Sequence, residues 1–114
     1  MSTDREPRAG ARCAIYARTA ASGAQAIDKQ LAQARAAVAK RGGVVVVQHR
    51  DVNVSGAGAP GSGLSALLAD VAAGEVDLVV VTGFTRLGRS ARAVNETLAA
   101  IDRGGARLLV VERA

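Results

Sequence analysis

The chain alternates between short apolar runs and longer stretches in which apolar residues recur at steps of three and four. Continuous apolar runs of this length are typical of buried strands, and the three-and-four spacing is typical of amphipathic helices. Each amphipathic stretch is followed by glycine, which accepts the left-handed conformation common at helix ends. The pattern predicts strands over 13–17, 44–48, 77–82 and 107–111, and helices over 26–41, 62–74 and 90–103.

This alternation of strand and helix is that of βαβ units, which place parallel strands in one sheet with helices on its faces. We therefore expect a single three-layer α/β domain over residues 12–114, with a mainly parallel four-stranded sheet and three helices. The β-branched run over 44–48 is expected to be buried on both faces. Ser62 is expected to cap the helix that follows. Residues 1–11 carry mixed charges without periodicity and are expected to form a disordered arm.

Composition narrows the class of protein. Hydrophobic residues make up 49% of the 114 residues and charged residues 22%, which are globular rather than disordered values. No apolar run approaches the ~20 residues that span a bilayer, and the polar start does not resemble a signal peptide. A soluble, cytoplasmic protein with no membrane association is expected. The single cysteine, Cys13, excludes a disulfide framework and a thiol-ligated structural zinc, and neither a metal nor a cofactor is expected.

The charge balance is +5, and all but two of the fifteen basic residues are arginine. Guanidinium groups grip phosphates with two hydrogen bonds, so this composition favours a polyanionic partner such as nucleic acid. Arginine- and alanine-rich usage is also what a GC-rich genome produces whatever the function. Net charge by itself leaves both interpretations open.

The carboxyl ends of parallel strands are where such sheets bind ligands. The segments expected at that edge are 18–22, the long loop over 51–61, and 83–89. They carry three arginines, Arg18, Arg86 and Arg89, together with Asp51 and Ser55. Three cations gathered at one edge repel each other unless an anion joins them, and a phosphate is the usual one. The alternative is that each arginine is solvated separately at the surface.

Four segments, in order along residues 12–111, resemble the resolvase/invertase family of serine recombinases. The first two are Tyr16-Ala17-Arg18, which is similar to the family's Tyr-x-Arg-Val-Ser, and Asp28-Lys29-Gln30, which is similar to its Leu-(Glu/Asp)-x-Gln. The third is residues 51–56 (Asp-Val-Asn-Val-Ser-Gly) followed by Gly63-Leu64, which is similar to its Asp-x-x-(x)-Ser-Gly loop and Gly-Leu. The fourth is residues 85–90 (Thr-Arg-Leu-Gly-Arg-Ser), which is similar to its Asp-Arg-Leu-(Gly/Ser)-Arg. The resemblance implies a resolvase-like fold.

It also implies a chemistry. In this family a serine hydroxyl attacks a DNA phosphodiester, which leaves a covalent phosphoserine link, while arginines stabilise the charge on the phosphoryl oxygens without a metal. By this resemblance Arg18, Arg86 and Arg89 match the phosphate-binding arginines. Asp51 and Ser55 match the acidic and serine positions of the active-site loop.

Three positions depart from the family pattern. Ala20 occupies the position of the nucleophilic serine, Gly61 stands where the family has a further arginine, and Thr85 replaces the acidic residue before Arg86. A methyl group cannot attack phosphorus, so no catalytic set is expected to be intact. Ser22 is the nearest substitute nucleophile, but along an extended segment it lies about 6–7 Å beyond Ala20, which spoils in-line geometry.

Family members continue past the fourth strand into a long helix that forms the dimer interface and then into a DNA-binding region, and the chain is expected to lack both. Two functions remain. The first is a non-catalytic binding or regulatory module that holds DNA weakly through its phosphates and pairs with itself or with an intact recombinase. The second is an active recombinase fragment that uses Ser22 as a non-standard nucleophile or is completed by a partner chain.

Overall fold

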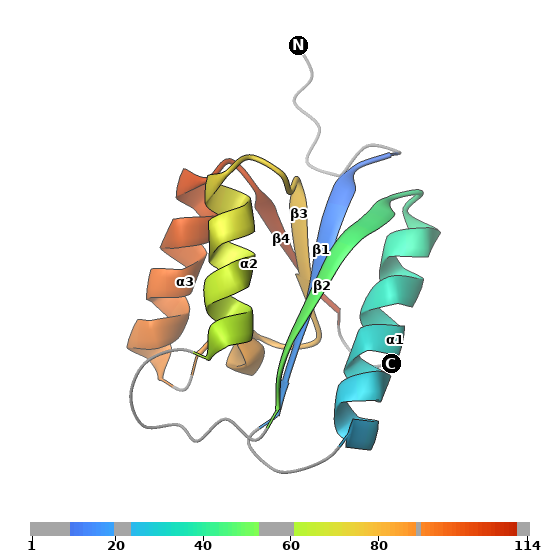
Figure 1. The fold of residues 1–114 in the computed structure, drawn as a ribbon, viewed down its shortest axis with the longest axis horizontal. Coiled ribbons are helices and arrows are strands. Elements are labelled where there is room, and N and C mark those ends of the chain that lie inside the picture. Colours follow the sequence, from blue (N-terminus) through green and yellow to red (C-terminus); the bar gives the residue numbers. More distant parts are fainter. Residues whose placement is uncertain (1–9, 20–23, 53–60, 89, 112–114) are drawn as a thin grey trace.

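A computed structural model describes residues 10–19, 24–52, 61–88 and 90–111. Four parallel strands form one sheet in the order β2-β1-β3-β4. Helix α1 covers one face of this sheet, and α2 and α3 cover the other (Figure 1). The expected α/β fold, with four parallel strands and three helices, is confirmed. In chain order the elements are β1 (Arg12–Thr19), α1 (Ala24–Lys40), β2 (Val44–Val52), α2 (Ser62–Ala72), β3 (Leu78–Val81), the 3-10 helix η1 (Phe84–Leu87), α3 (Ala91–Arg103) and β4 (Arg107–Val110).

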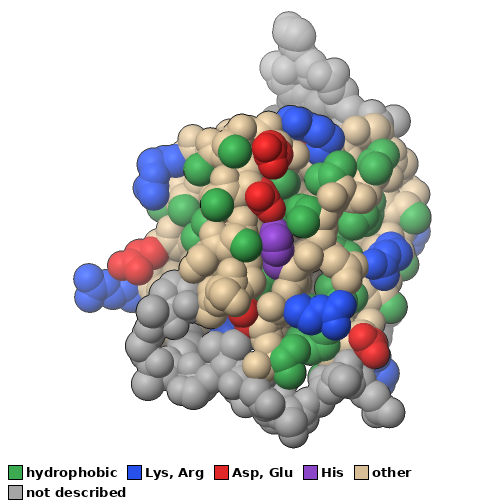
Figure 2. Space-filling model, viewed as in Figure 1, with side chains coloured by type: hydrophobic (Ala, Val, Ile, Leu, Met, Phe, Trp, Pro, Cys, Tyr) green, Lys and Arg blue, Asp and Glu red, His purple; other side chains and the backbone are tan. Residues whose placement is uncertain are grey.

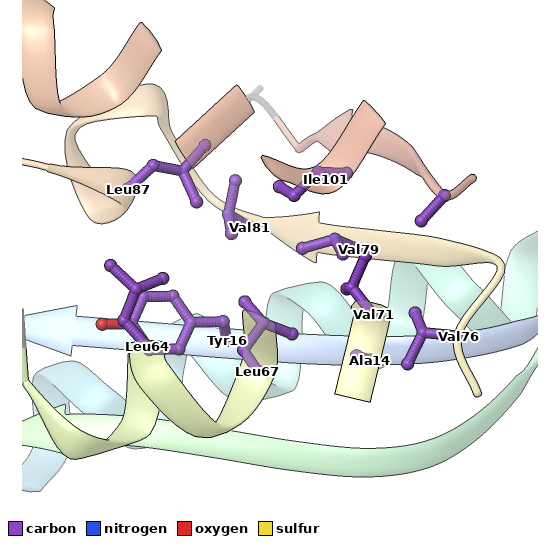
Figure 3. Close-up of a cluster of buried hydrophobic side chains, with 11 residues drawn as sticks. Ala14, Tyr16, Leu64, Leu67, Val71, Val76, Val79, Val81, Leu87 and Ile101 are labelled. Atoms are coloured by element: carbon purple, nitrogen blue, oxygen red, sulfur yellow. The ribbon is translucent and has the colours of Figure 1, made fainter. Parts of the chain in front are cut away.

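The hydrophobic core lies on both sides of β1, whose side chains alternate between two layers. Ile15 and Ala17 pack with the residues of α1, whereas Tyr16 packs with residues of α2, β3 and η1 (Figure 3). All three are at most 1% exposed. Because successive side chains of a strand point to opposite faces, Arg18 follows Tyr16 onto the α2 and α3 side. The alternation of the core therefore determines where this arginine points.

Strand β2 lies at the edge of the sheet, so the prediction that it is buried on both faces was wrong. The Val44 and Val46 side chains are 52% and 47% exposed. A continuous β-branched run is typical of a strand inside a parallel sheet, where helices cover both faces. The strand order gives β2 only β1 as a neighbour.

A bulge in β2 changes which way its later residues point. Cys13 of β1 pairs with Val45, and the next residue, Ala14, pairs with Val47, so Val46 is the extra residue. Val45 packs on the α1 side and Val47 on the α2 side, although residues two apart in a regular strand share a face. Beyond the bulge, the alternation continues from Val47. Asp51 consequently faces α2, and it lies within the strand rather than in the loop where the sequence analysis placed it.

The chain before β1 is joined to the rest of the domain from residue 10 onward. The Gly10 N–H donates to the Gly42 carbonyl oxygen at 2.7 Å, and the Ala11 carbonyl accepts from the Val44 N–H at 2.9 Å. The remainder of the expected arm lies outside the described residues. Across the described part of the chain, no helix is long and apolar enough to cross a membrane.

Candidate functional site

Arg18 and Arg86 meet at the carboxyl edge of the sheet, the lower edge in Figure 1, and each binds the other's backbone segment. Nη1 of Arg18 donates to the carbonyl oxygen of Thr85 at 3.1 Å, and Nη1 of Arg86 donates to the carbonyl oxygen of Arg18 at 3.3 Å. Nε of Arg86 also donates to the Thr82 hydroxyl at 3.3 Å. These bonds join the end of β1 to η1, a 3-10 helix that the sequence pattern did not predict.

Gln30 holds the backbone of Arg18 from the α1 side. Its Oε1 accepts from the Arg18 N–H, and its Nε2 donates to the Arg18 carbonyl oxygen, both at 3.0 Å. The Gln30 residue is 6% exposed. In the sequence, Gln30 stands out only as part of the resemblance to the recombinase family. Its role could have been suspected from its polar side chain among the apolar positions of the helix.

Asp51 is a buried carboxylate that accepts three hydrogen bonds. The Tyr16 hydroxyl donates to Oδ2 at 2.6 Å, the Gly63 N–H to Oδ1 at 2.8 Å, and the Leu64 N–H to Oδ2 at 2.9 Å. Two of these donors belong to the first turn of α2, where unpaired N–H groups favour negative charge. Asp51 is 5% exposed, and its three hydrogen bonds join β1, β2 and α2.

The prediction that Ser62 caps α2 was wrong. Gly61 is the N-cap residue and makes no side-chain cap bond, and Ser62 is the first residue of the helix. A carboxylate from a strand performs the capping instead, which no local sequence signal reveals. At α3 a serine does cap the helix: the hydroxyl of Ser90, which was predicted to be the first helical residue, accepts from the Ala93 N–H at 3.1 Å.

The glycines at the start of α2 allow Asp51 to reach the helix. A Cβ atom at position 61 would lie 2.5 Å from Oδ1 of Asp51, and one at position 63 would collide with the carbonyl oxygen of Arg50. Contacts this close require the neighbouring atoms to move. Gly61, which the sequence analysis considered only as a missing arginine, therefore has a packing role.

Burial raises the pKa of the Tyr16 hydroxyl, and the hydrogen bond to Asp51 and the charge of Asp51 raise it further. A raised pKa means that the folded state disfavours the ionised form. The stability linked to Tyr16 is therefore complete below the ordinary tyrosine pKa of about 10 and is lost as the pH rises above it.

We predict that Tyr16 ionises only as the domain unfolds in alkali. Since the chain has one tyrosine and no tryptophan, tyrosinate absorbance reports Tyr16 alone. It should rise together with the loss of helical circular dichroism, in one step above about pH 10. In Tyr16→Phe the alkaline loss of stability should be less steep. Ionisation near pH 10 with unchanged circular dichroism would contradict this prediction.

Several predicted site residues lie outside the described residues: Ala20, Ser22, Ser55 and Arg89. Thr85 is exposed on η1, with its carbonyl bound by Arg18. The described residues contain no group of three His, Cys, Asp or Glu side chains that could hold a metal ion.

The face over the β2 edge shows no gathering of basic charge in its described part. In Figure 2 the Lys and Arg side chains on this face lie apart from one another. At its centre is His49, the single histidine, whose Nε2 lies 2.8 Å from Oδ2 of Asp70 on α2. The described part of this face therefore offers no cluster of cations for a phosphate.

Comparison with known proteins agrees with the geometry. The family model described as "Resolvase, N terminal domain" matches residues 13–114, which is nearly the whole chain. The chain belongs to this family. It is a homologue of the catalytic domain of the serine recombinases. No curated protein sequence matches the chain.

Solved structures similar to this resolvase-type domain include those of two recombinases and an integrase. The C-terminal catalytic domain of ISC1926 TnpA, an IS607-like serine recombinase, has a TM-score of 0.80 at 27% identity, covering 90% of this chain and 71% of that one. The N-terminal catalytic domain of TP901-1 integrase has a TM-score of 0.80 at 22% identity, covering 88% and 77%. A resolvase family site-specific recombinase from Streptococcus pneumoniae has a TM-score of 0.76 at 22% identity, covering 89% and 72%.

Proposed function

We propose that this resolvase-type domain binds the phosphates of DNA at Arg18 and Arg86 without cleaving the strand, and that it serves as a binding or regulatory module. The observation that carries the proposal is a pair of hydrogen bonds, from Arg18 to the Thr85 carbonyl oxygen and from Arg86 to the Arg18 carbonyl oxygen. Ala20 lies two residues after Arg18. The two arginines can bind an anion, whereas the side chain of Ala20 has no hydroxyl that could act as a nucleophile. Arg89, by resemblance a third phosphate ligand, follows in the same segment.

The electrostatics of the two arginines favour an anion. Among the described residues, the acceptors bound by Arg18 and Arg86 are carbonyl and hydroxyl oxygens, which carry no charge. Asp51 is already occupied by three donors. A guanidinium group has five N–H donors, and Arg18 uses one nitrogen and Arg86 two in these bonds. Both therefore keep donors for a phosphate.

The absence of cleavage rests on the identity of the residues in the sequence. Ala20 has no hydroxyl, and Ser22 is displaced by about 6–7 Å if the segment is extended. An in-line attack needs the nucleophile within about 3–3.5 Å of phosphorus. The alternative function, an active fragment that uses Ser22, requires the segment after β1 to bring Ser22 back to the position of Ala20.

The experiment is a titration of a fluorescent DNA duplex at several salt concentrations. We expect Arg86→Ala to weaken DNA binding about tenfold. The slope of the logarithm of the binding constant against the logarithm of the salt concentration should fall in magnitude by about one, because one phosphate contact is lost. The control is Arg103→Ala, which removes an equal charge from the exposed end of α3 and should change binding much less. Equal losses in the two variants would show that only net charge matters.

The same samples, run on a denaturing gel, test the second half of the proposal. We expect no covalent link between protein and DNA, with intact or nicked duplex. A covalent adduct that disappears in Ser22→Ala would establish the alternative function instead.

A further inference from the structure

Strand β1 extends further along the sheet than its neighbour β3. The pairing between them covers Cys13–Ile15, whereas on the other side β1 pairs with β2 as far as Thr19. Arg18 lies three residues beyond the pairing with β3. A buried backbone group that has no strand partner needs another hydrogen bond, because an unsatisfied one destabilises the fold.

Gln30 supplies this missing partner. Its side-chain amide accepts from the Arg18 N–H and donates to the Arg18 carbonyl, as the backbone of an adjacent strand would do. Gln30 reaches the strand end because it lies on the buried side of α1, with Ile27, Leu31 and Ala34. The packing of α1 on the sheet thus fixes the position of the amide.

The Arg18 carbonyl oxygen is also the acceptor for Arg86. Nε2 of Gln30 and Nη1 of Arg86 donate to this one atom, at 3.0 Å and 3.3 Å. The atom that holds the Arg86 guanidinium is therefore itself held by Gln30. The same amide fixes the backbone from which the Arg18 side chain reaches Thr85.

We propose that Gln30 is a positioning residue of the Arg18–Arg86 site, acting through the Arg18 backbone to keep both guanidinium groups in place for a phosphate. This inference rests on the phosphate binding proposed above. Gln30 does not itself contact the anion. Gln30 restricts the conformations of the two arginine side chains before the anion binds, so less conformational entropy is lost on binding. Such preorganisation increases the affinity for the anion.

The test is a sulfate titration of the intact chain, followed by nuclear magnetic resonance of the arginine Nε–H groups. In the wild type we expect Arg18 and Arg86 to respond together. Gln30→Met keeps the length of the side chain but removes both hydrogen bonds, and it should weaken sulfate binding about tenfold and reduce the Arg86 response. The matched control is Gln33→Met, a half-buried position on the same helix, which should bind as the wild type does.

A double-variant cycle separates positioning from general stability. If Gln30 acts through Arg86, then adding Gln30→Met to Arg86→Lys should cause much less further loss than Gln30→Met does alone. Additive losses, or unchanged sulfate binding in Gln30→Met, would overturn the positioning role. If Gln30→Met does not fold, Gln30→Asn gives the same comparison without a change of charge, since it keeps the amide but is too short by one methylene to reach the Arg18 backbone. A wild type that does not respond to sulfate would instead overturn the proposed function itself.

Discussion

Replacing Asp51 with alanine should lower the free energy of unfolding by about 3–5 kcal/mol. The substitution leaves the Tyr16 hydroxyl and the Gly63 and Leu64 N–H groups without their acceptor, in a place closed to water. It also removes the negative charge at the start of α2. Domains of this kind are stable by only about 5–15 kcal/mol, so the variant should be close to unfolding at room temperature.

Urea unfolding followed by circular dichroism measures the effect. Asp51→Asn keeps one acceptor oxygen and should lose less stability than Asp51→Ala. The control is Glu96→Ala, which breaks the exposed Arg92–Glu96 pair at 3.3 Å and should cost no more than about 0.5 kcal/mol. If Asp51→Ala and Glu96→Ala unfold at similar urea concentrations, Asp51 does not join the strands to α2 as described.

An arginine at position 61 should also destabilise the domain, by about 3 kcal/mol or more, and should not restore cleavage. The family pattern has an arginine at this position, and the sequence alone suggests that an arginine in place of Gly61 would restore positive charge to the site. In the structure, even a Cβ at position 61 would lie 2.5 Å from Oδ1 of Asp51. The added side chain therefore has to push Asp51 away from the N–H groups that it caps.

Thermal unfolding and a denaturing gel test this together in three variants: Ala20→Ser, Ala20→Ser with Gly61→Arg, and Ala20→Ser with Ser62→Arg. The Ser62 substitution adds the same charge one residue later, at an exposed position, and should leave stability nearly unchanged. We expect no covalent adduct from Ala20→Ser alone, since one restored member of a catalytic set gains little. A stable Gly61→Arg double variant that forms an adduct with DNA would show that Asp51 can move without harm.

The sequence was sufficient for the order of the elements because each element is set by local periodicity. It was not sufficient for β2, because its exposure depends on the strand order and the direction of Asp51 depends on the bulge at Val46. A continuous run of four valines hides a bulge, since every residue in it fits either face. The 3-10 helix over Phe84–Leu87 was missed for a related reason, because four residues are too few to show a period.

The sequence was sufficient to predict which residues lie at the carboxyl edge of the sheet, because this depends only on which residues follow each strand. Arg18 and Arg86 follow strands β1 and β3, and the carboxyl ends of parallel strands share one edge. Sequence could not reveal that Arg18 binds the Thr85 carbonyl and Arg86 the Arg18 carbonyl, or that Gln30 completes the end of β1. Both depend on β3 being shorter than β1. The structure also gives Asp51, which sequence matched to a catalytic position, a structural role that by itself accounts for its burial.

A crystal structure of the chain grown with phosphate tests the central claim most directly. We expect a phosphate within hydrogen-bond distance of both the Arg18 and Arg86 guanidinium groups, while Gln30 still holds the Arg18 backbone and Asp51 still caps α2. No side-chain hydroxyl should lie in line with the phosphorus atom. A phosphate bound elsewhere, with the two arginines directed apart into solvent, would contradict the account.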